Sequence, residues 1–199
     1  MELTAKQRDT LTELINIAYA RAAGALSDLT GHRITLAVPD VTIRRIDSVT
    51  PALQEVIDGE ITCVNQFFGG PIAGNAILLF DKSAAQILTR LLTNNPKADI
   101  RDEASRDTMI ELGNIVLNAC LGAFGNLMHV NLKFTVPHLQ VDEIENVLRS
   151  IRIQDQKFEY AMMIRTRFEI RASDISSFLV ILFGITSLER VLEDLRKWG

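Results

Sequence analysis

Two copies of one polar pattern are the residues of this chain that could do chemistry. Each copy is an Asp, then three residues, a Glu, two residues, an Asn, twenty-two residues and a Pro. The first copy is Asp9, Glu13, Asn16 and Pro39, and the second is Asp107, Glu111, Asn114 and Pro137. If each residue type occurs at about 5%, two copies in one chain arise by chance on the order of once in a million. The pattern therefore reflects a duplicated fold, a duplicated chemistry or both.

The asparagines point to a reaction in which a water molecule has to be oriented. A carboxamide cannot act as a general base, but it donates and accepts hydrogen bonds at once, so it can position an attacking water. Hydrolysis by phosphoryl transfer needs a positioned water, because its catalysis is mostly positioning and charge stabilisation. Asn16 and Asn114 are therefore candidate catalytic residues. Glu13 and Glu111, one helical turn away, could pair with a cation on a partner.

The chain offers no metal or phosphate site of its own by sequence. It contains neither the P-loop pattern nor the glycine pattern of dinucleotide-binding loops. The three histidines, His32, His129 and His138, show no ligand-cluster spacing. If the Glu/Asn pairs are catalytic, metal and phosphoryl group must arrive together on a protein substrate.

Two long helices must position these residues. The first is expected from residue 4 to about 30, with a capping box at Thr4 and Gln7 and a stop at Gly31, and the second from about 105 to 128. At about 100° per residue, each Asp-Glu-Asn set forms one stripe. On the opposite side of the first helix lies the apolar stripe that should face the core: Leu11, Leu14, Ile15, Ala18, Ala22, Ala25 and Leu29.

Small residues continue the polar stripes, which should face solvent. They are Ala20, Ala23, Gly24 and Ser27 in the first helix, followed in the second by Asn118, Gly122 and Gly125. Small side chains leave the helix surface low, so a partner's backbone could approach closely. We expect Asp9, Asp107, Gly24 and Gly122 to contact a partner. An exposed Glu and Asn on one helix would ordinarily be only solvated, but Asn is a mediocre helix former and recurs at the same exposed position.

The two halves of the chain align when shifted by 98 residues, and 77–80 resembles 180–183 at a slightly larger offset. We expect an α/β (α+β) fold: one domain, 1–199, built from two internal repeats of about 1–98 and 99–199. The architecture should be a pseudo-two-fold sandwich with a largely antiparallel sheet and two long helices on its surface. Strands are expected at 34–38, 60–68, 72–80, 131–136, 158–170 and 176–183, and helices at 83–93 and 186–197. Each proline is expected to end a strand, because proline cannot continue the ladder.

The charge of −4 gives no bulk footprint for nucleic acid, and 47% hydrophobic residues are typical of a globular chain. Small basic clusters lie at Arg44 and Arg45 and at Arg165, Arg167 and Arg171. They are more typical of solvated strand faces than of a partner-binding patch.

Compartment and membrane association follow from short features. The N-terminus lacks the apolar core of a signal peptide, and the longest apolar run, 178–183, is too short to span a bilayer. Cys63 and Cys120 each lie in apolar stretches, which predicts buried thiols in a reducing compartment rather than a disulfide. We expect a cytoplasmic protein without membrane insertion.

Both copies of the pattern match the motif of a known family. The chain resembles the CheC/CheX/FliY phosphatases of chemotaxis, whose motif is Asp or Ser, three residues, Glu, two residues, Asn, twenty-two residues and Pro. The segments 13–17 and 25–31 are also similar to the N-terminal helix of CheC. Two complete motifs resemble CheC, whereas CheX has one. FliY carries an additional C-terminal switch domain, which we do not expect here.

The resemblance implies hydrolysis of the aspartyl phosphate on the response regulator CheY. Asn16 and Asn114 would enter the regulator's active site and position water, and Glu13 and Glu111 would engage its active-site lysine. Mg²⁺ would be held by the regulator's acidic residues, so no cofactor of the chain's own is expected. The implied partner is a phosphorylated CheY-like regulator, with the receptor deamidase CheD as a second candidate. The chain itself is expected to be a monomer.

Two alternatives remain open from the sequence. The flagellar switch protein FliM has a related middle domain that serves assembly, so a non-catalytic binding module is the first. Intact Glu/Asn pairs in both halves disfavour it. The second alternative keeps the phosphatase chemistry but acts on a response regulator outside chemotaxis, which the sequence does not distinguish from CheY.

Overall fold

The computed structural model describes residues 3–57, 59–152, 158–170 and 173–197, without the side chains of residues 38, 39, 148, 151 and 152. Its helices are α1 (Ala5–Thr30), α2 (Val49–Gln54), α3 (Lys82–Leu92), α4 (Glu103–Leu127), α5 (Ile144–Arg152) and α6 (Ile185–Lys197), with a 3-10 turn, η1 (Ile46–Ser48). Its strands are β1 (Ile34–Arg45), β2 (Glu60–Gly69), β3 (Gly74–Asp81), β4 (Lys133–Phe134), β5 (His138–Glu143), β6 (Tyr160–Ile170) and β7 (Ser173–Phe183).

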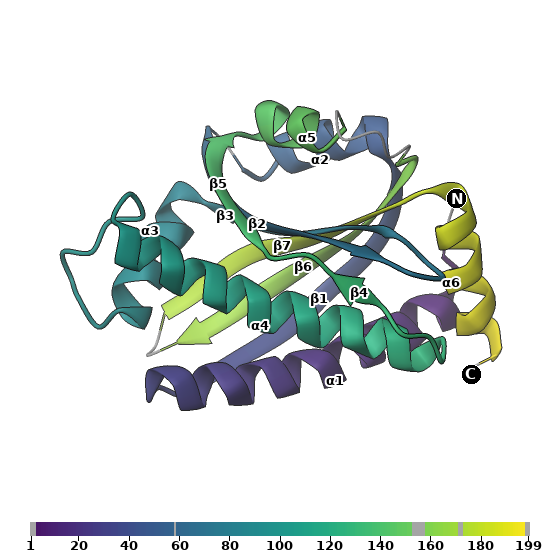
Figure 1. Cartoon of the computed structure of the whole chain (residues 1–199), viewed down its shortest axis with the longest axis horizontal. Helices are drawn as coiled ribbons and strands as arrows, with labels where there is room; N and C mark the ends of the chain where they lie inside the picture. Colours follow the sequence, from purple (N-terminus) through teal and green to yellow (C-terminus); the bar gives the residue numbers. More distant parts are fainter. Residues whose placement is uncertain (1–2, 58, 153–157, 171–172, 198–199) are drawn as a thin grey trace.

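The strands form one antiparallel sheet in the order β1-β6-β7-β3-β2, and β4 and β5 both pair with β2. Every strand pair in it is antiparallel. Helices cover both faces of this sheet (Figure 1). The mixed fold with an antiparallel sheet that the sequence predicts is therefore confirmed.

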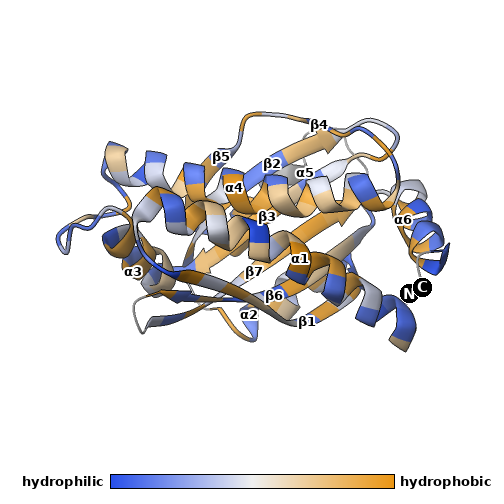
Figure 2. Ribbon diagram, turned by 90° about the horizontal axis from the view of Figure 1, so that it is seen from below, coloured by the Kyte–Doolittle hydropathy of each residue, from blue (hydrophilic) through white to orange (hydrophobic). Residues whose placement is uncertain are grey.

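The sheet separates two cores. The long helices α1 and α4 cover one face, flanked by α3 and α6, and their apolar residues join those of the sheet in the larger core. The short helices α2 and α5 cover the other face over a smaller core. Figure 2, which looks onto the long helices, shows α1 and α4 side by side across the sheet. Their outward sides therefore face away from the sheet on the same side of the molecule.

The central strands β3 and β7 come one from each half of the chain. Strands β3 and β7 pair so that Ile77 lies opposite Val180, the two positions that the sequence comparison equates. Each half runs as a long helix, strand, short helix, hairpin and final helix, with the second half's first strand split into β4 and β5. This order fits the proposed pair of internal repeats within one domain, which stays a prediction.

Local signals set the ends of α1 as predicted. The Gln7 backbone N–H donates to Thr4 Oγ1 over 3.2 Å, and the Thr4 N–H donates to Gln7 Oε1 over 3.0 Å. These bonds satisfy N–H groups that a helix start leaves free. Gly31 ends the helix with φ 68°, a left-handed conformation that glycine adopts without a Cβ penalty. The capping box and the stop are both confirmed.

The prediction that Pro39 ends its strand is wrong. Strand β1 continues through Pro39 to Arg45, and its register against β6 shifts between Ala37 and Asp40. Proline is tolerated because β1 is an edge strand, where an N–H can be missing on the open side, and because a bulge breaks the ladder locally. The side chain of Pro39 lies outside the described part of the chain.

The second proline lies in a break rather than at the end of a long strand. Pro137 lies between β4 and β5, so the strand expected at 131–136 is reduced to the two residues Lys133–Phe134. The sequence also missed α2, β5 and α5. Arg171, in the hairpin expected between β6 and β7, lies outside the described residues.

Both cysteines are buried and free, as predicted. Burial raises the pKa of the Cys63 thiol to about 12 and also raises the pKa of Cys120. In the larger core, Tyr19 Oη and Thr166 Oγ1 lie 2.7 Å apart, which ties α1 to β6. Burial raises the pKa of Tyr19 as well, so this contact stays uncharged and fixes the helix on the sheet.

One described helix, α4, is long and apolar enough to cross a membrane by length and composition alone. Its apolar residues pack against α1 and the sheet, as in the core helix of a globular protein. Packing in the larger core therefore explains why α4 is rich in apolar residues.

Candidate functional site

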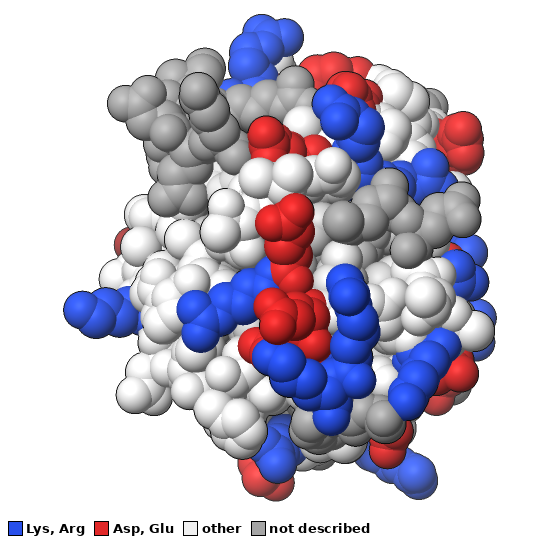
Figure 3. All heavy atoms as spheres, turned by 90° about the vertical axis from the view of Figure 1, so that its right-hand side faces the viewer, with Lys and Arg blue, Asp and Glu red and all other residues white. Residues whose placement is uncertain are grey.

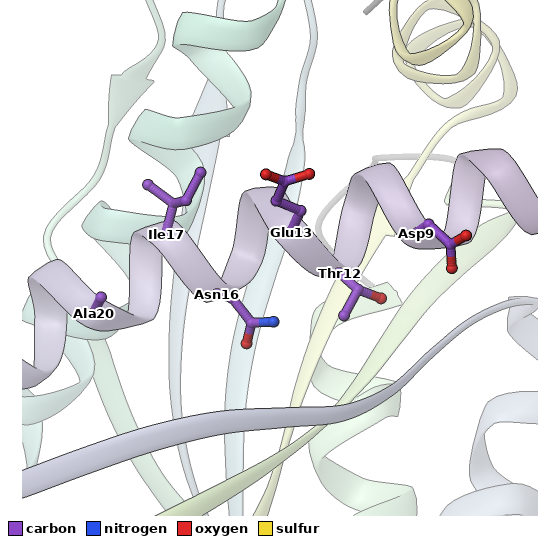
Figure 4. Close-up of a pocket in the computed structure, with 6 residues that line it drawn as sticks. All are labelled: Asp9, Thr12, Glu13, Asn16, Ile17 and Ala20. Atoms are coloured by element: carbon purple, nitrogen blue, oxygen red, sulfur yellow. The ribbon is translucent and has the colours of Figure 1, made fainter. Parts of the chain in front are cut away.

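The first polar stripe lies on the outward side of α1. Asp9, Glu13 and Asn16 are all exposed there. Together with Thr12, Ile17 and Ala20 they line an open groove of about 480 Å³. Figure 4 shows Glu13 and Ile17 pointing to one side of the helix, and Asp9, Thr12 and Asn16 to the other. A partner docked on this surface could thus meet the carboxylate and the carboxamide with different groups.

Nothing in the described part of the chain uses these side chains for folding. None of the described residues forms a hydrogen bond or ion pair with the side chain of Asp9, Glu13 or Asn16. Ile17 beside them is 42% exposed, a large apolar side chain left in solvent. The groove therefore offers a carboxylate, a carboxamide and an apolar contact that are all available to a partner.

The buried side of α1 differs in part from the predicted apolar stripe. Leu11, Leu14, Ile15, Ala18 and Ala22 are buried as predicted, but Ala25 and Leu29 are exposed. Ala23, placed on the solvent side by the sequence, is buried, as are Tyr19 and Leu26. The buried arc turns along the helix, because a straight helix meets a twisted sheet at a changing angle.

The second stripe lies on α4, with its glutamate at the junction of the two long helices. Asp107 and Glu111 are exposed, and Asn114 is half-buried. A groove of about 340 Å³ lies between the start of α4 and the end of α1, lined by Leu26, Leu29, Thr30, Leu92, Asp107, Thr108, Glu111 and Leu112. Because α1 and α4 run in opposite directions, the two motifs lie toward opposite ends of the helical layer.

Asn114 has a partner that Asn16 lacks. The Asn118 Nδ2 group donates a hydrogen bond of 2.7 Å to Asn114 Oδ1. In α1 the corresponding residue is Ala20, which cannot form such a bond. The two sites therefore have the same residue types but different surroundings. Sequence reasoning placed Asn118 on the stripe without detecting this contact.

A glycine that sequence reasoning missed sets the depth of α4 on the sheet. A Cβ added to Gly113 would lie 2.4 Å from Val64 Cγ1 and 2.6 Å from Val64 Cβ. The helix thus approaches β2 at the residue directly before Asn114. The sequence does contain a signal for this contact. A glycine in the interior of a helix is about 1 kcal/mol less favourable than alanine, so its presence indicates a close neighbour or a function.

Among the described residues, Gly24 and Gly122 have no such neighbour. A Cβ added at either would meet no described atom within 4 Å. Gly125, which the sequence placed on the same exposed stripe, is buried instead, and its added Cβ would lie 3.0 Å from the Val130 carbonyl oxygen. Gly24 and Gly122 thus remain candidates for close approach by a partner, whereas Gly125 accommodates the chain's own turn.

We predict that Gly24→Ala and Gly122→Ala raise the free energy of unfolding by up to about 1 kcal/mol each, because alanine favours the helix. We also expect both to weaken binding of the partner proposed below, because the added methyl groups stand where its backbone would lie. Chemical denaturation and a binding titration measure the two effects. Gly125→Ala is the matched control, since its crowded Cβ should cancel the helical gain. Unchanged affinity in both variants would exclude the two glycines from the docking surface.

The described residues offer no group of three or more His, Cys, Asp and Glu side chains that could hold a metal ion. In β6, Arg167 Nε lies 3.3 Å from Asp174 Oδ1, and Arg165 lies opposite Asp40 in the register of β1 and β6. At the end formed by α6, acidic and basic side chains are interleaved (Figure 3), and Lys197 Nζ lies 3.0 Å from Asp194 Oδ1. Neither region presents charges of a single sign.

Comparison with known proteins adds relatives and a shared fold. No protein-family model matches the chain. Over 166 residues the chain is 25% identical to the CheY-P phosphatase CheC of Bacillus subtilis, covering 81% of the chain and 79% of that protein. It is 20% identical to the flagellar motor switch phosphatase FliY of the same bacterium, over 98% of the chain but 50% of FliY. The chain thus spans half the length of that second relative.

Solved structures share the fold at low sequence identity. FliY of Thermotoga maritima superposes with a TM-score of 0.78 at 18% identity, covering 100% of both chains. The middle domain of FliM from H. pylori superposes with a TM-score of 0.69 at 10% identity, covering 96% of this chain and 99% of that one. The resemblance to the CheC/CheX/FliY phosphatases that the sequence predicts is therefore confirmed by two sequence relatives and by the shared fold.

Proposed function

We propose that this chain hydrolyses the aspartyl phosphate of a CheY-type response regulator at two sites, one on α1 and one on α4. The observation that carries the proposal is the placement of the Glu/Asn pairs. Both pairs lie on the outward side of a long helix, and Glu13 and Asn16 engage no other described side chain. The relationship to CheC, a CheY-P phosphatase in Bacillus subtilis, supports the choice of reaction.

The asparagines orient water in this mechanism. The amide of Asn16 or Asn114 holds a water molecule opposite the bond between phosphorus and the regulator's aspartate. The water oxygen attacks phosphorus and the bond to the aspartyl oxygen breaks, which yields inorganic phosphate, a free carboxylate and a proton released to solvent. Mg²⁺ would be held by the acidic residues of the phosphorylated regulator and would supply charge neutralisation there. The chain contributes orientation and exclusion of bulk water rather than a nucleophile.

The glutamates dock the partner. Glu13 and Asn16 line the same groove but point toward different edges of it, so Glu13 can bind a cation on the regulator without crowding the phosphoryl group (Figure 4). Glu111 lies in the groove where exposed Leu29 adds an apolar contact. The regulator's active-site lysine is the cation that we assign to both.

We expect the double charge reversal Glu13→Lys/Glu111→Lys to weaken regulator binding by about tenfold or more, because an attractive charge pair becomes a repulsive one. The dissociation constant for the phosphorylated receiver domain measures this effect. Glu55→Lys/Glu145→Lys, two exposed glutamates on the opposite layer, changes the net charge equally and serves as the control. Equal affinities for the two double variants would exclude the lysine pairing.

A direct assay separates the phosphatase from a binding module. A CheY-type receiver domain is phosphorylated with acyl phosphate in the presence of Mg²⁺, and decay of its aspartyl phosphate is followed with and without the chain. A phosphatase accelerates the decay catalytically at substoichiometric amounts. A FliM-like module, which the shared fold keeps as the second candidate, binds the receiver but leaves the decay rate unchanged or slows it. Binding without acceleration would refute the proposed reaction.

Further parts of the assignment stay predictions. Parallel assays on receiver domains from outside chemotaxis would show whether CheY is the preferred substrate. Binding to CheD and a monomeric state follow from the resemblance alone. A cytoplasmic location fits the two free, buried thiols, because thiols persist in reducing compartments.

A further inference from the structure

The second site holds its asparagine in place, and the first site does not. Asn118 Nδ2 donates to Asn114 Oδ1 over 2.7 Å, and both side chains are half-buried on α4. On α1 the corresponding pair is Asn16 and Ala20, both exposed, and none of the described residues bonds the Asn16 side chain. The difference lies one helical turn beyond the residue proposed to orient water.

Folding alone gives Asn118 no advantage. Its Oδ1 atom is buried and has no hydrogen-bond partner among the described residues, which is unfavourable for a polar atom. Asparagine is also a poorer helix former than alanine, and the corresponding position of α1 holds alanine. If the Asn118 amide were turned over, its Oδ1 would face Asn114 Oδ1, and two oxygens without a hydrogen cannot bond, so the contact requires the Nδ2 group on the side of Asn114. The side chain is therefore explained by what it does for Asn114.

We infer that Asn118 is a positioning residue that fixes the amide of Asn114 before the regulator docks, an inference that rests on the proposed function. The hydrogen bond restricts the side-chain torsions of Asn114. It leaves the second lone pair of Asn114 Oδ1 and both N–H groups available for water. Asn16 has to lose the same torsional freedom during docking. The site on α4 accordingly turns over faster than the site on α1.

The test isolates the second site in an Asn16→Ala background. There, Asn118→Ala should lower kcat about two- to tenfold, the effect of losing one intramolecular hydrogen bond, and leave KM within about twofold. Asn118→Gln, which keeps an amide, should restore part of the rate. The thermal midpoint should stay level or rise with Asn118→Ala, so that lost stability does not explain the lower rate.

The converse experiment introduces the corresponding amide next to Asn16 in the first site. In an Asn114→Ala background, Ala20→Asn places an amide one turn beyond Asn16, where exposed Ala20 lines the open groove. It should raise kcat by about the same factor. Ala20→Asp has nearly the same shape but no N–H to donate, and it should not raise the rate.

The outcomes separate this inference from the proposed function. If Asn114→Ala abolishes the activity left in the Asn16→Ala background but Asn118→Ala leaves kcat unchanged, the positioning role is overturned and the phosphatase stands. If Asn16→Ala/Asn114→Ala retains the wild-type rate, the proposed catalytic residues themselves are overturned. A lower kcat with Asn118→Ala, partial rescue by Asn118→Gln and a gain with Ala20→Asn together support the inference.

Discussion

Replacing Asn16 and Asn114 together by alanine is expected to lower the rate of aspartyl-phosphate hydrolysis by about a hundredfold or more, to nearly the rate without the chain. Misplacing a reacting group by about 1 Å can cost a hundredfold, and alanine leaves the water without any orienting amide. Each single variant should keep partial activity, because the other site stays intact. By the argument for Asn118, Asn114→Ala should lose more than Asn16→Ala.

The measurement is single-turnover decay of a phosphorylated receiver domain at saturating chain. Asn16 is exposed, so its truncation should change the free energy of unfolding by no more than about 0.5 kcal/mol, whereas Asn114→Ala also removes the acceptor of the Asn118 bond and should cost up to about 1.5 kcal/mol. Asn126→Ala, at an exposed asparagine of α4 outside the motif, is the control and should behave as wild type. Wild-type decay in the double variant would contradict the water-orienting mechanism.

Gly113→Ala is expected to destabilise the chain by about 1–3 kcal/mol, because the added Cβ overlaps a buried side chain. That Cβ would lie 2.4 Å from Val64 Cγ1, and β-branched valine on a central strand has few ways to move aside. The helix must shift away from β2, which also moves the adjacent Asn114. Chemical denaturation measures the stability, and the activity left in an Asn16→Ala background reports the displacement.

Gly122→Ala is the matched control on the same helix. Its added Cβ meets no atom within 4 Å, so this variant should gain stability where Gly113→Ala loses it. Adding Val64→Ala to Gly113→Ala should give a smaller loss than the sum of the two single losses, because the overlap is removed. Equal stability of Gly113→Ala and Gly122→Ala would show that α4 does not depend on close approach at Gly113.

The ends of α1 and its exposed stripe are predicted correctly from the sequence, because they depend on nearby residues alone. The capping box at Thr4, the stop at Gly31 and the outward stripe of Glu13 and Asn16 all follow from backbone chemistry and the helical period. Features that depend on neighbouring elements were read poorly. Pro39 lies within a strand because that strand has an open edge, and Ala25 is exposed because the sheet beneath the helix twists.

The sequence by itself determined the antiparallel sheet with long helices and the exposed placement of Glu13, Asn16 and Glu111, because residue order and the helical period set which side of a helix each residue occupies. Only the tertiary structure decided that α1 and α4 lie side by side in opposite directions and that α4 approaches Val64 at Gly113. It also showed that Asn118 holds Asn114 while Asn16 is free of such a contact. Distances between side chains depend on packing and rotamers, which a repeated pattern of residue types leaves open.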